Sequence, residues 1–289
     1  MLLSRILTAL ILLPLAIAGI LYLPTNYFAV VVAVIFILAA YEWTKISLIG
    51  PTYDLLFMSL IVFFMWFLWV SGLNEAERFL SIIFISVIFW TSSIFFIVLF
   101  PRYRSLWSSI LLLKFLVGFM VLIPSWYALI LLKNMQETQF FNTQINGSEL
   151  VLIMMIMIWT ADTGAYFSGK KWGKSKLIPN VSPGKTKQGA YGAIISTCIA
   201  AVIFSFTFLT QNILSSFYIV LFTVLIVIIS IVGDLFESMY KRNSGIKDSG
   251  KILPGHGGVL DRIDSLTSVA PIFYVLLYVL SSRVSGSIL

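Results

Sequence analysis

The sequence has few charged residues, one cysteine and one histidine. Charged side chains make up 11% of its 289 residues and 60% are hydrophobic, whereas about 25% charged is usual in soluble domains. Most of the chain therefore cannot face water. The lone Cys198 excludes an intrachain disulfide, and one cysteine with one histidine cannot form a zinc shell. The sequence also has no soluble module or basic tail, so nucleic acid is not expected as a partner.

What the sequence does contain is long apolar runs along its whole length. About 20 apolar residues in a helix cross the hydrocarbon core of a bilayer, and the runs lack the alternation of barrel strands. We expect an all-α polytopic integral membrane protein with about nine transmembrane helices. The third and ninth runs are short, which leaves eight or ten helices open. The runs lie near residues 6–23, 27–43, 55–70, 79–100, 106–132, 150–167, 189–209, 213–233 and 267–281.

The basic residues predict an orientation, because lysine and arginine accumulate in cytoplasmic loops. Placing the N-terminus inside puts most of them inside, including the lysines from Lys170 to Lys187. The formal net charge of +7 then gives a basic cytoplasmic face that attracts lipid headgroups or nucleotide phosphates. The first run resembles a cleavable signal peptide, but its apolar sequence continues to Leu23, which favours a retained helix. We expect a bacterial cell (inner) membrane protein with its catalytic loops in the cytoplasm.

Polar residues divide the chain into two parts. Residues 1–132 have short loops with few ionisable side chains and are expected to form a scaffold and a lipid-facing wall. Residues 133–289 are expected to be the catalytic part. Two of their predicted cytoplasmic loops, 170–188 and 234–266, are dense in Gly, Pro, Lys and Asp.

The first candidate site residues precede and occupy the loop at 170–188. Asp162 ends an apolar run, where a carboxylate is costly unless it lines a polar cavity, binds a cation or pairs with a base; capping a helix break is the alternative. The following GKKWGKSKLIPNVSPGKTKQG is not a P-loop, because Pro179 stands where that pattern needs glycine. Its glycines and lysines, with Ser182 and Thr186, fit phosphate binding or an ordinary positive-inside signal.

The last polar segment has the most specific pattern. Asp234, Glu237 and Lys241 share one face at helical spacing, and Asp261 and Asp264, three residues apart, share another. The glycines of the intervening LPGHGG permit a sharp bend that can bring the two acidic helix ends together. Carboxylates from separate segments with interleaved Lys and Arg suit a phosphate-bearing substrate held through Mg²⁺. A solvated interfacial loop is the alternative.

The stretch SMYKRNSGIKDSGKILPGHGGVLDRIDS, residues 238–265, resembles the signature of the phosphatidate cytidylyltransferases, also called CDP-diacylglycerol synthases. DTGAYFSGKKWGKSKL and SPGKTKQG are similar to two upstream patches of that family, so the resemblance covers about residues 159–266. Its length favours this family over the related dolichol and phytol kinases. Lys187 and Gln188 stand where members commonly carry an aromatic residue and a glutamate, so no acidic role is transferred there.

The resemblance implies a nucleotidyltransferase of phospholipid biosynthesis, which joins CTP and phosphatidic acid into CDP-diacylglycerol and diphosphate. The lipid phosphate would be the nucleophile, and with a second pKa near ~6 it needs no strong general base. The aspartates are then expected chiefly as Mg²⁺ ligands, first Asp234 and Asp261, and a second, monovalent cation stays open. His256 is expected either to orient or protonate a phosphate or to brace the turn.

The residues that the resemblance implies fall into two groups. The catalytic group is Asp234, Asp261, Asp264, Asp248, His256, Lys241 and Arg242. The substrate-binding group is Asp162, Tyr166, Ser182, Lys185, Thr186, Lys247, Arg262, Gly257 and Gly258.

Two other functions stay open on the sequence alone. An ion-coupled transporter would use Asp162 and the loop acids, but transporters often have repeated halves, whereas the polar sites here lie in the second half only. A polyprenol or phytol-type lipid kinase is nearest in chemistry and would convert ATP to ADP. Besides the two substrates, membrane lipids are expected partners, and a homodimer is compatible with the sequence.

Overall fold

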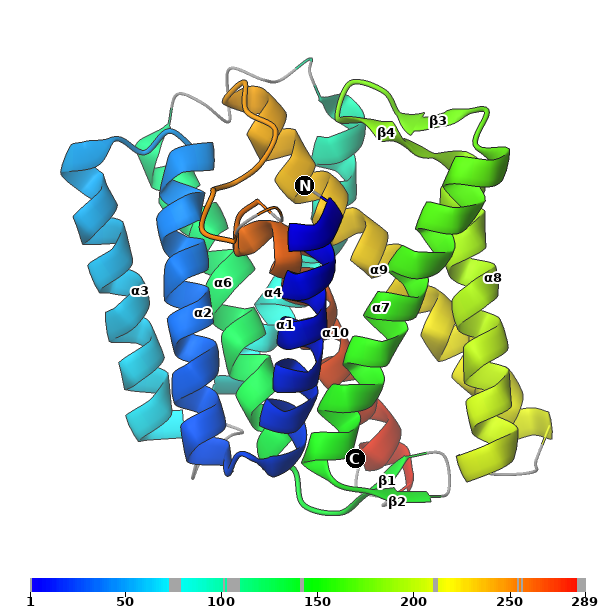
Figure 1. Ribbon diagram of the computed structural model, residues 1–289. Helices are drawn as coiled ribbons and strands as arrows, with labels where there is room; N and C mark the ends of the chain where they lie inside the picture. The colour runs from blue at the N-terminus through cyan, green and yellow to red at the C-terminus, as the bar shows by residue number, and fades with distance from the viewer. Residues whose placement is uncertain are drawn as a thin grey trace.

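The computed structural model describes residues 2–72, 79–100, 102, 110–140, 143–209, 213–253, 255 and 257–284. Within these residues the chain forms a bundle of long helices and two short antiparallel hairpins (Figure 1). The helices are α1 (Leu2–Tyr22), α2 (Thr25–Ile46), α3 (Pro51–Gly72), α4 (Leu80–Leu99), α6 (Leu111–Asn134), α7 (Gly147–Trp172), α8 (Lys187–Phe204), α9 (Ile213–Asn243) and α10 (Leu260–Val284). The strands are β1 (Thr138–Phe140), β2 (Thr143–Ile145), β3 (Lys176–Ile178) and β4 (Ser182–Thr186).

The outer faces of the helices are apolar. Among the described residues, eight helices, α2 to α4 and α6 to α10, are long and apolar enough to cross a membrane, and the apolar part of α1, Leu10–Tyr22, is shorter. Large apolar side chains such as Leu55 and Phe95 are more than two-thirds exposed, at 74% and 69%, a pattern that suits contact with lipid. The predicted all-α integral membrane protein is confirmed. That α1 is a ninth span stays a prediction.

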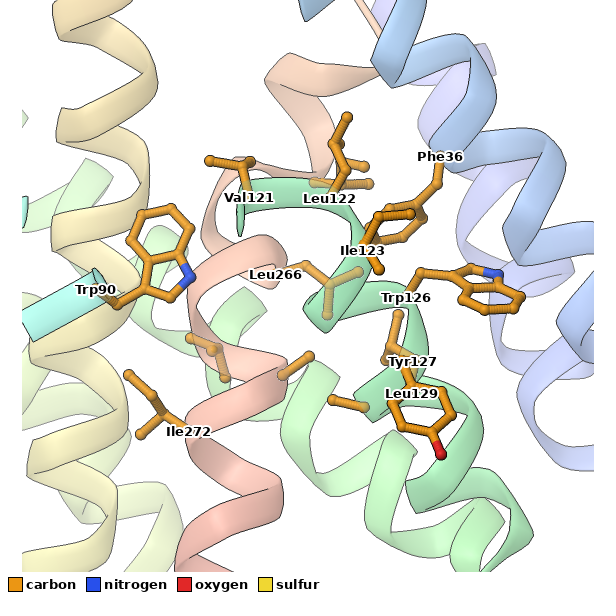
Figure 2. Close-up of a cluster of buried hydrophobic side chains, with 14 of the residues drawn as sticks. Phe36, Trp90, Val121, Leu122, Ile123, Trp126, Tyr127, Leu129, Leu266 and Ile272 are labelled. Atoms are coloured by element: carbon orange, nitrogen blue, oxygen red, sulfur yellow. The ribbon is translucent and has the colours of Figure 1, made fainter. Parts of the chain in front are cut away.

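The core surrounds α6 and α10. Figure 2 shows side chains of this core, which point from α6 to several sides, and all of those labelled are buried. They are Phe36 of α2, Trp90 of α4, six residues of α6 between Val121 and Leu129, and Leu266 and Ile272 of α10. Because α10 packs against α2, α4, α6, α7 and α9, its polar first turns are held in place from several sides.

Small residues let α7 and α8 approach each other closely. A Cβ at Gly164 would overlap the Ser196 side chain and would lie 2.8 Å from the Gly192 carbonyl oxygen. A Cβ at Gly192 would overlap the Ser168 side chain. Helices in membranes associate through such close backbone contacts, so these residues fix the two helices that flank the β3–β4 hairpin.

The polar segments begin and end at other residues than the sequence predicted. The expected loop 170–188 contains the end of α7, the β3–β4 hairpin and the start of α8, and the expected loop 234–266 is helical at 234–243 and 260–266. A hydropathy pattern predicts that a helix ends where its apolar residues end. In the structure the helices extend further, because helical backbone hydrogen bonds continue where the polar side chains find partners. Of the described residues in this segment, only those between 244 and 259 lie outside the helices. The assignment of scaffold and catalytic roles to residues 1–132 and 133–289 stays a prediction.

Polar elements gather at one end of the bundle. Figure 1 shows the β3–β4 hairpin and the loop after α9 at the upper end, with the β1–β2 hairpin at the opposite end. The upper end therefore holds the polar segments that the sequence singled out.

Candidate active site

A cavity of about 650 Å³ opens among α7, α8, α9, α10 and the β3–β4 hairpin. Its wall combines small residues, including Ala165, Gly189 and Ala193, with most of the polar residues that the sequence singled out. Those residues are Asp162, Tyr166, Lys185, Thr186, Asp234, Lys241, Asp248, Asp261, Arg262 and Asp264. Segments about a hundred residues apart in the chain thus meet in one polar site.

Lys241 joins two helices at the site. Its Nζ donates a hydrogen bond to Asp261 Oδ1 at 2.6 Å and lies 3.2 Å from Glu237 Oε1 one turn earlier in α9. The side chains of Lys241, Glu237 and Asp261 are only 9%, 5% and 7% exposed. Buried charges are tolerated when they are paired, so this lysine compensates both carboxylates. The sequence placed Glu237 on the same helix face but gave it no role.

Asp261 is fixed by backbone donors as well. Its Oδ2 accepts hydrogen bonds from the Ser249 and Gly258 N–H groups at 3.0 and 2.8 Å. Gly257 has φ +86°, and a Cβ there would lie 2.8 Å from Asp261 Oδ2. A side chain at this position would be strained and would press on the carboxylate. Gly257 and Gly258 therefore shape the loop around Asp261 and are not among the residues that line the cavity.

Three of the other four carboxylates that line the cavity, Asp162, Asp234 and Asp264, interact electrostatically through Asp234. Asp234 forms an ion pair with Lys185 of β4, and Asp162 and Asp264 each interact electrostatically with both of these residues. Arg262 also interacts with Asp162. Asp234 is thus near two like charges, and the hairpin supplies a cation to the acids of α7, α9 and α10.

The predicted substrate-binding residues of the β3–β4 hairpin differ in their position relative to the cavity. Lys185 and Thr186 line the cavity, whereas Ser182 does not. The Thr186 hydroxyl oxygen accepts a hydrogen bond from the Gly189 N–H at 3.1 Å and so caps the start of α8. The hydroxyl thus has a structural contact at the edge of the cavity.

The two residues that depart from the family pattern lie beside this cap. Gln188 Oε1 accepts hydrogen bonds from the backbone N–H groups of Lys174 and Ser175 at 3.1 and 3.2 Å, and Lys187 is exposed. The side chain of Gln188 therefore holds the turn before β3.

Some predicted residues lie away from the cavity wall. Arg242 donates from Nη1 to the Ile246 carbonyl oxygen at 3.1 Å and braces the end of α9. Lys247 is exposed and does not line the cavity. His256 lies outside the described residues.

Glu42 is a buried acid beside the site that was not predicted from the sequence. This residue of α2 is 1% exposed, and its Oε2 accepts hydrogen bonds from Ser249 Oγ at 2.9 Å and from the Leu260 N–H at 2.7 Å. The available signal was an acid within an apolar run, the same signal that identified Asp162.

No three Asp, Glu, His or Cys side chains in the described part of the chain are grouped closely enough to hold a metal ion by themselves.

Comparison with known proteins adds an independent finding. Residues 3–280 match the sequence model of the cytidylyltransferase family. The phosphatidate cytidylyltransferase of Pseudomonas aeruginosa is 36% identical over 278 residues, which cover 96% of this chain and 97% of that protein. That of Haemophilus influenzae is 34% identical over 285 residues, or 94% of this chain and 97% of that protein. The Bacillus subtilis protein of the same name is 43% identical over 135 residues, 47% of this chain and 49% of that protein.

Proposed function

The chain belongs to the cytidylyltransferase family, and from this premise we propose that it transfers the cytidylyl group of CTP to phosphatidic acid. The products are CDP-diacylglycerol, an intermediate of phospholipid biosynthesis, and diphosphate. The observation that carries the proposal is the cavity, in which carboxylates and cations from three helices, the β3–β4 hairpin and the loop after α9 meet at one end of membrane-spanning helices. Such a site can bind a water-soluble nucleotide while the acyl chains of the lipid stay in the bilayer.

The side chains suit two phosphate-bearing substrates. Lys185 and Arg262 line the cavity and can bind triphosphate or lipid phosphate oxygens through charge-assisted hydrogen bonds. Tyr166 also lines it and is 60% exposed on α7. We assign Asp162 and Tyr166 to the route by which the lipid headgroup enters from the membrane.

The chemistry requires little acid–base catalysis from the protein. A phosphate monoester is largely a dianion at neutral pH, so an oxygen of the lipid phosphate attacks the α-phosphorus of CTP directly. The new bond joins that oxygen to the α-phosphorus, the bond to the β-phosphate bridging oxygen breaks, and diphosphate leaves with the electron pair. Positioning and electrostatic stabilisation of the phosphates then supply most of the catalysis.

The acids of the cavity fit a Mg²⁺ requirement. Asp234 interacts electrostatically with Asp162 and Asp264, and a divalent cation would relieve the repulsion among these carboxylates. Asp234 is the first candidate ligand. Asp261 can offer only Oδ1, the oxygen that Lys241 contacts, because two backbone N–H groups already bind Oδ2. When bound, Mg²⁺ would neutralise negative charge on the CTP phosphates.

Asp248, an exposed residue of the cavity wall, would support the metal or substrate. Arg242, Lys247, Ser182, Thr186 and His256 stay predictions as substrate or catalytic contacts. The cytoplasmic orientation, the bacterial membrane, the monovalent cation and the homodimer stay predictions too.

Diphosphate release by the purified protein tests the function. Detergent-solubilised protein is given phosphatidic acid, Mg²⁺ and each nucleoside triphosphate in turn, alongside Asp234→Asn and Asp261→Asn. We expect release that needs both CTP and the lipid and that is lost in Asp261→Asn. We expect Asp234→Asn to raise the Mg²⁺ concentration for half-maximal activity by about tenfold or more, as loss of a metal-site partner does.

Other outcomes would indicate a different function or a different metal site. Release of ADP in place of diphosphate, with ATP as the substrate, would make the protein a lipid kinase. No turnover of any nucleotide by folded protein would favour a transporter. Unchanged Mg²⁺ dependence in Asp234→Asn would remove this residue from the metal site while leaving the reaction intact.

A further inference from the structure

Glu42 connects the first half of the chain to the loop at 244–259. Its Oε2 accepts hydrogen bonds from Ser249 Oγ and from the Leu260 N–H, one near each end of the irregular segment. Figure 1 shows this loop beside the upper end of α2. A buried carboxylate is costly unless its partners are well placed, so the loop and Glu42 stabilise each other.

Two glycines of the loop leave space for this carboxylate. A Cβ at Gly250 would overlap it, and the three nearest atoms to that Cβ all belong to Glu42. A Cβ at Gly258 would overlap Glu42 Oε2 and Ser249 Oγ. The backbone of the loop therefore lies directly against the carboxylate.

The same loop residues hold Asp261. Ser249, whose hydroxyl donates to Glu42, donates its backbone N–H to Asp261 Oδ2 at 3.0 Å, and its Oγ accepts from the Asp261 N–H at 3.3 Å. Gly258, which faces Glu42, donates its N–H to the same Oδ2 at 2.8 Å. The two residues that donate backbone N–H groups to Asp261, Ser249 and Gly258, are thus the same residues that contact Glu42.

The neighbouring residue supports the partner of Asp261. The Trp43 ring packs against Tyr240, with centroids 4.7 Å apart, and its indole N–H donates to the Lys114 carbonyl oxygen at 3.2 Å. Tyr240 directly precedes Lys241, which donates to Asp261. The end of α2 therefore contacts residues next to both members of the Lys241–Asp261 pair: Trp43 packs against Tyr240, and Glu42 accepts a hydrogen bond from Ser249.

We infer that Glu42 is a positioning residue for the transfer reaction: its Oε2 holds Ser249 and the loop so that Ser249 and Gly258 orient the Asp261 carboxylate. The inference rests on the proposed function. It assigns to α2 a specific part in the active site, through backbone atoms and without contact with substrate.

Steady-state kinetics of full-length variants test this role. Removing the acceptor in Glu42→Ala should lower kcat by about 10- to 100-fold, the size of effect expected when a reacting group is misplaced by about 1 Å. The KM values for CTP and phosphatidic acid should stay within about twofold, because no substrate contact is lost. Glu42→Gln should keep kcat within about threefold, because its amide oxygen can accept both hydrogen bonds. Asp54→Asn is the control, since this acid of α3 pairs with Lys45 away from the cavity.

A second pair of variants tests the contact itself. Gly250→Ala should displace the carboxylate and reproduce the fall in kcat, whereas adding Gly250→Ala to Glu42→Ala should cause no further loss. Hydrogen exchange measured by mass spectrometry should show faster exchange at residues 249–260 in Glu42→Ala, with unchanged exchange in α7 and α8.

Several results would overturn the inference. They are a wild-type kcat in Glu42→Ala, a loss in Glu42→Gln equal to that in Glu42→Ala, or faster exchange throughout the bundle. If Glu42→Ala does not fold, a wild-type kcat in Gly250→Ala has the same meaning. Wild-type protein without CTP-dependent turnover would overturn the proposed function instead, and the exchange experiment would still decide whether Glu42 holds the loop.

Discussion

Charged residues that line the cavity differ in how deeply their side chains are buried. Lys241 lies between Glu237 and Asp261, and all three side chains are nearly buried. Lys185 pairs with Asp234, but their side chains are 26% and 30% exposed. The two lysines have the same charge and line the same cavity, so the difference in burial should separate their effects on stability.

Lys241→Met should destabilise the protein by about 3–5 kcal/mol, because it leaves two buried carboxylates without their cation. Lys185→Met should change stability by less than about 1 kcal/mol, as is usual for exposed pairs. It should nevertheless lower kcat/KM by about 10- to 100-fold through loss of a charged phosphate donor. Thermal unfolding in detergent and diphosphate release measure the two effects. Equal unfolding temperatures for the two variants would contradict this account.

Some of these residue roles could be predicted and others could not. The sequence predicted Asp234, Asp261 and Asp264 because they lie in one segment, where the helical spacing and the resemblance to the family both indicate them. Glu42 was missed because its partners, Ser249 and Leu260, are more than two hundred residues away. Local sequence shows that an acid is intramembrane but not what it contacts.

At the scale of elements, the site depends on close packing of helices. The α7–α8 contact is formed by glycines and serines, and Ala161, Ala165, Ala190 and Ala193 of the same two helices line the cavity. The separation of these helices therefore sets the width of the cavity.

Gly164→Ala and Gly192→Ala should each destabilise the protein by about 1–3 kcal/mol, the usual cost of overpacking, because each Cβ overlaps a serine of the facing helix. Activity should fall as the cavity widens. Thermal unfolding and turnover should be compared with Gly19→Ala in α1, where the Cβ would lie an ordinary 3.6 Å from Leu23 Cδ1. If Gly19→Ala is as harmful as the other two, helix packing is not the cause.

At the scale of the whole molecule, the β3–β4 hairpin, which lines the cavity, and the β1–β2 hairpin lie at opposite ends of the bundle (Figure 1). The basic residues predict that the end with the site faces the cytoplasm. This prediction concerns orientation and is independent of the reaction.

Cysteine labelling measures the orientation. In a Cys198→Ala background, which has no other cysteine, Gln144→Cys in β2 and Lys176→Cys in β3 place one exposed thiol at each end. A membrane-impermeant maleimide should label Gln144→Cys in intact spheroplasts and Lys176→Cys only after permeabilisation. The reverse pattern would put the site on the outside.

The sequence by itself determined the membrane class, the helical fold and the family. Long apolar runs are unfavourable in water and therefore indicate a membrane protein. The order of carboxylates, lysines and glycines is a local pattern that can be compared with a family without knowing the fold. Tertiary structure alone decided that Lys241 joins Asp261 to Glu237, that the hairpin brings Lys185 to Asp234, and that Glu42 holds the loop around Asp261. These contacts depend on which helices pack together. Apolar helix faces can pack in many pairings, so no local sequence pattern specifies which helices become neighbours.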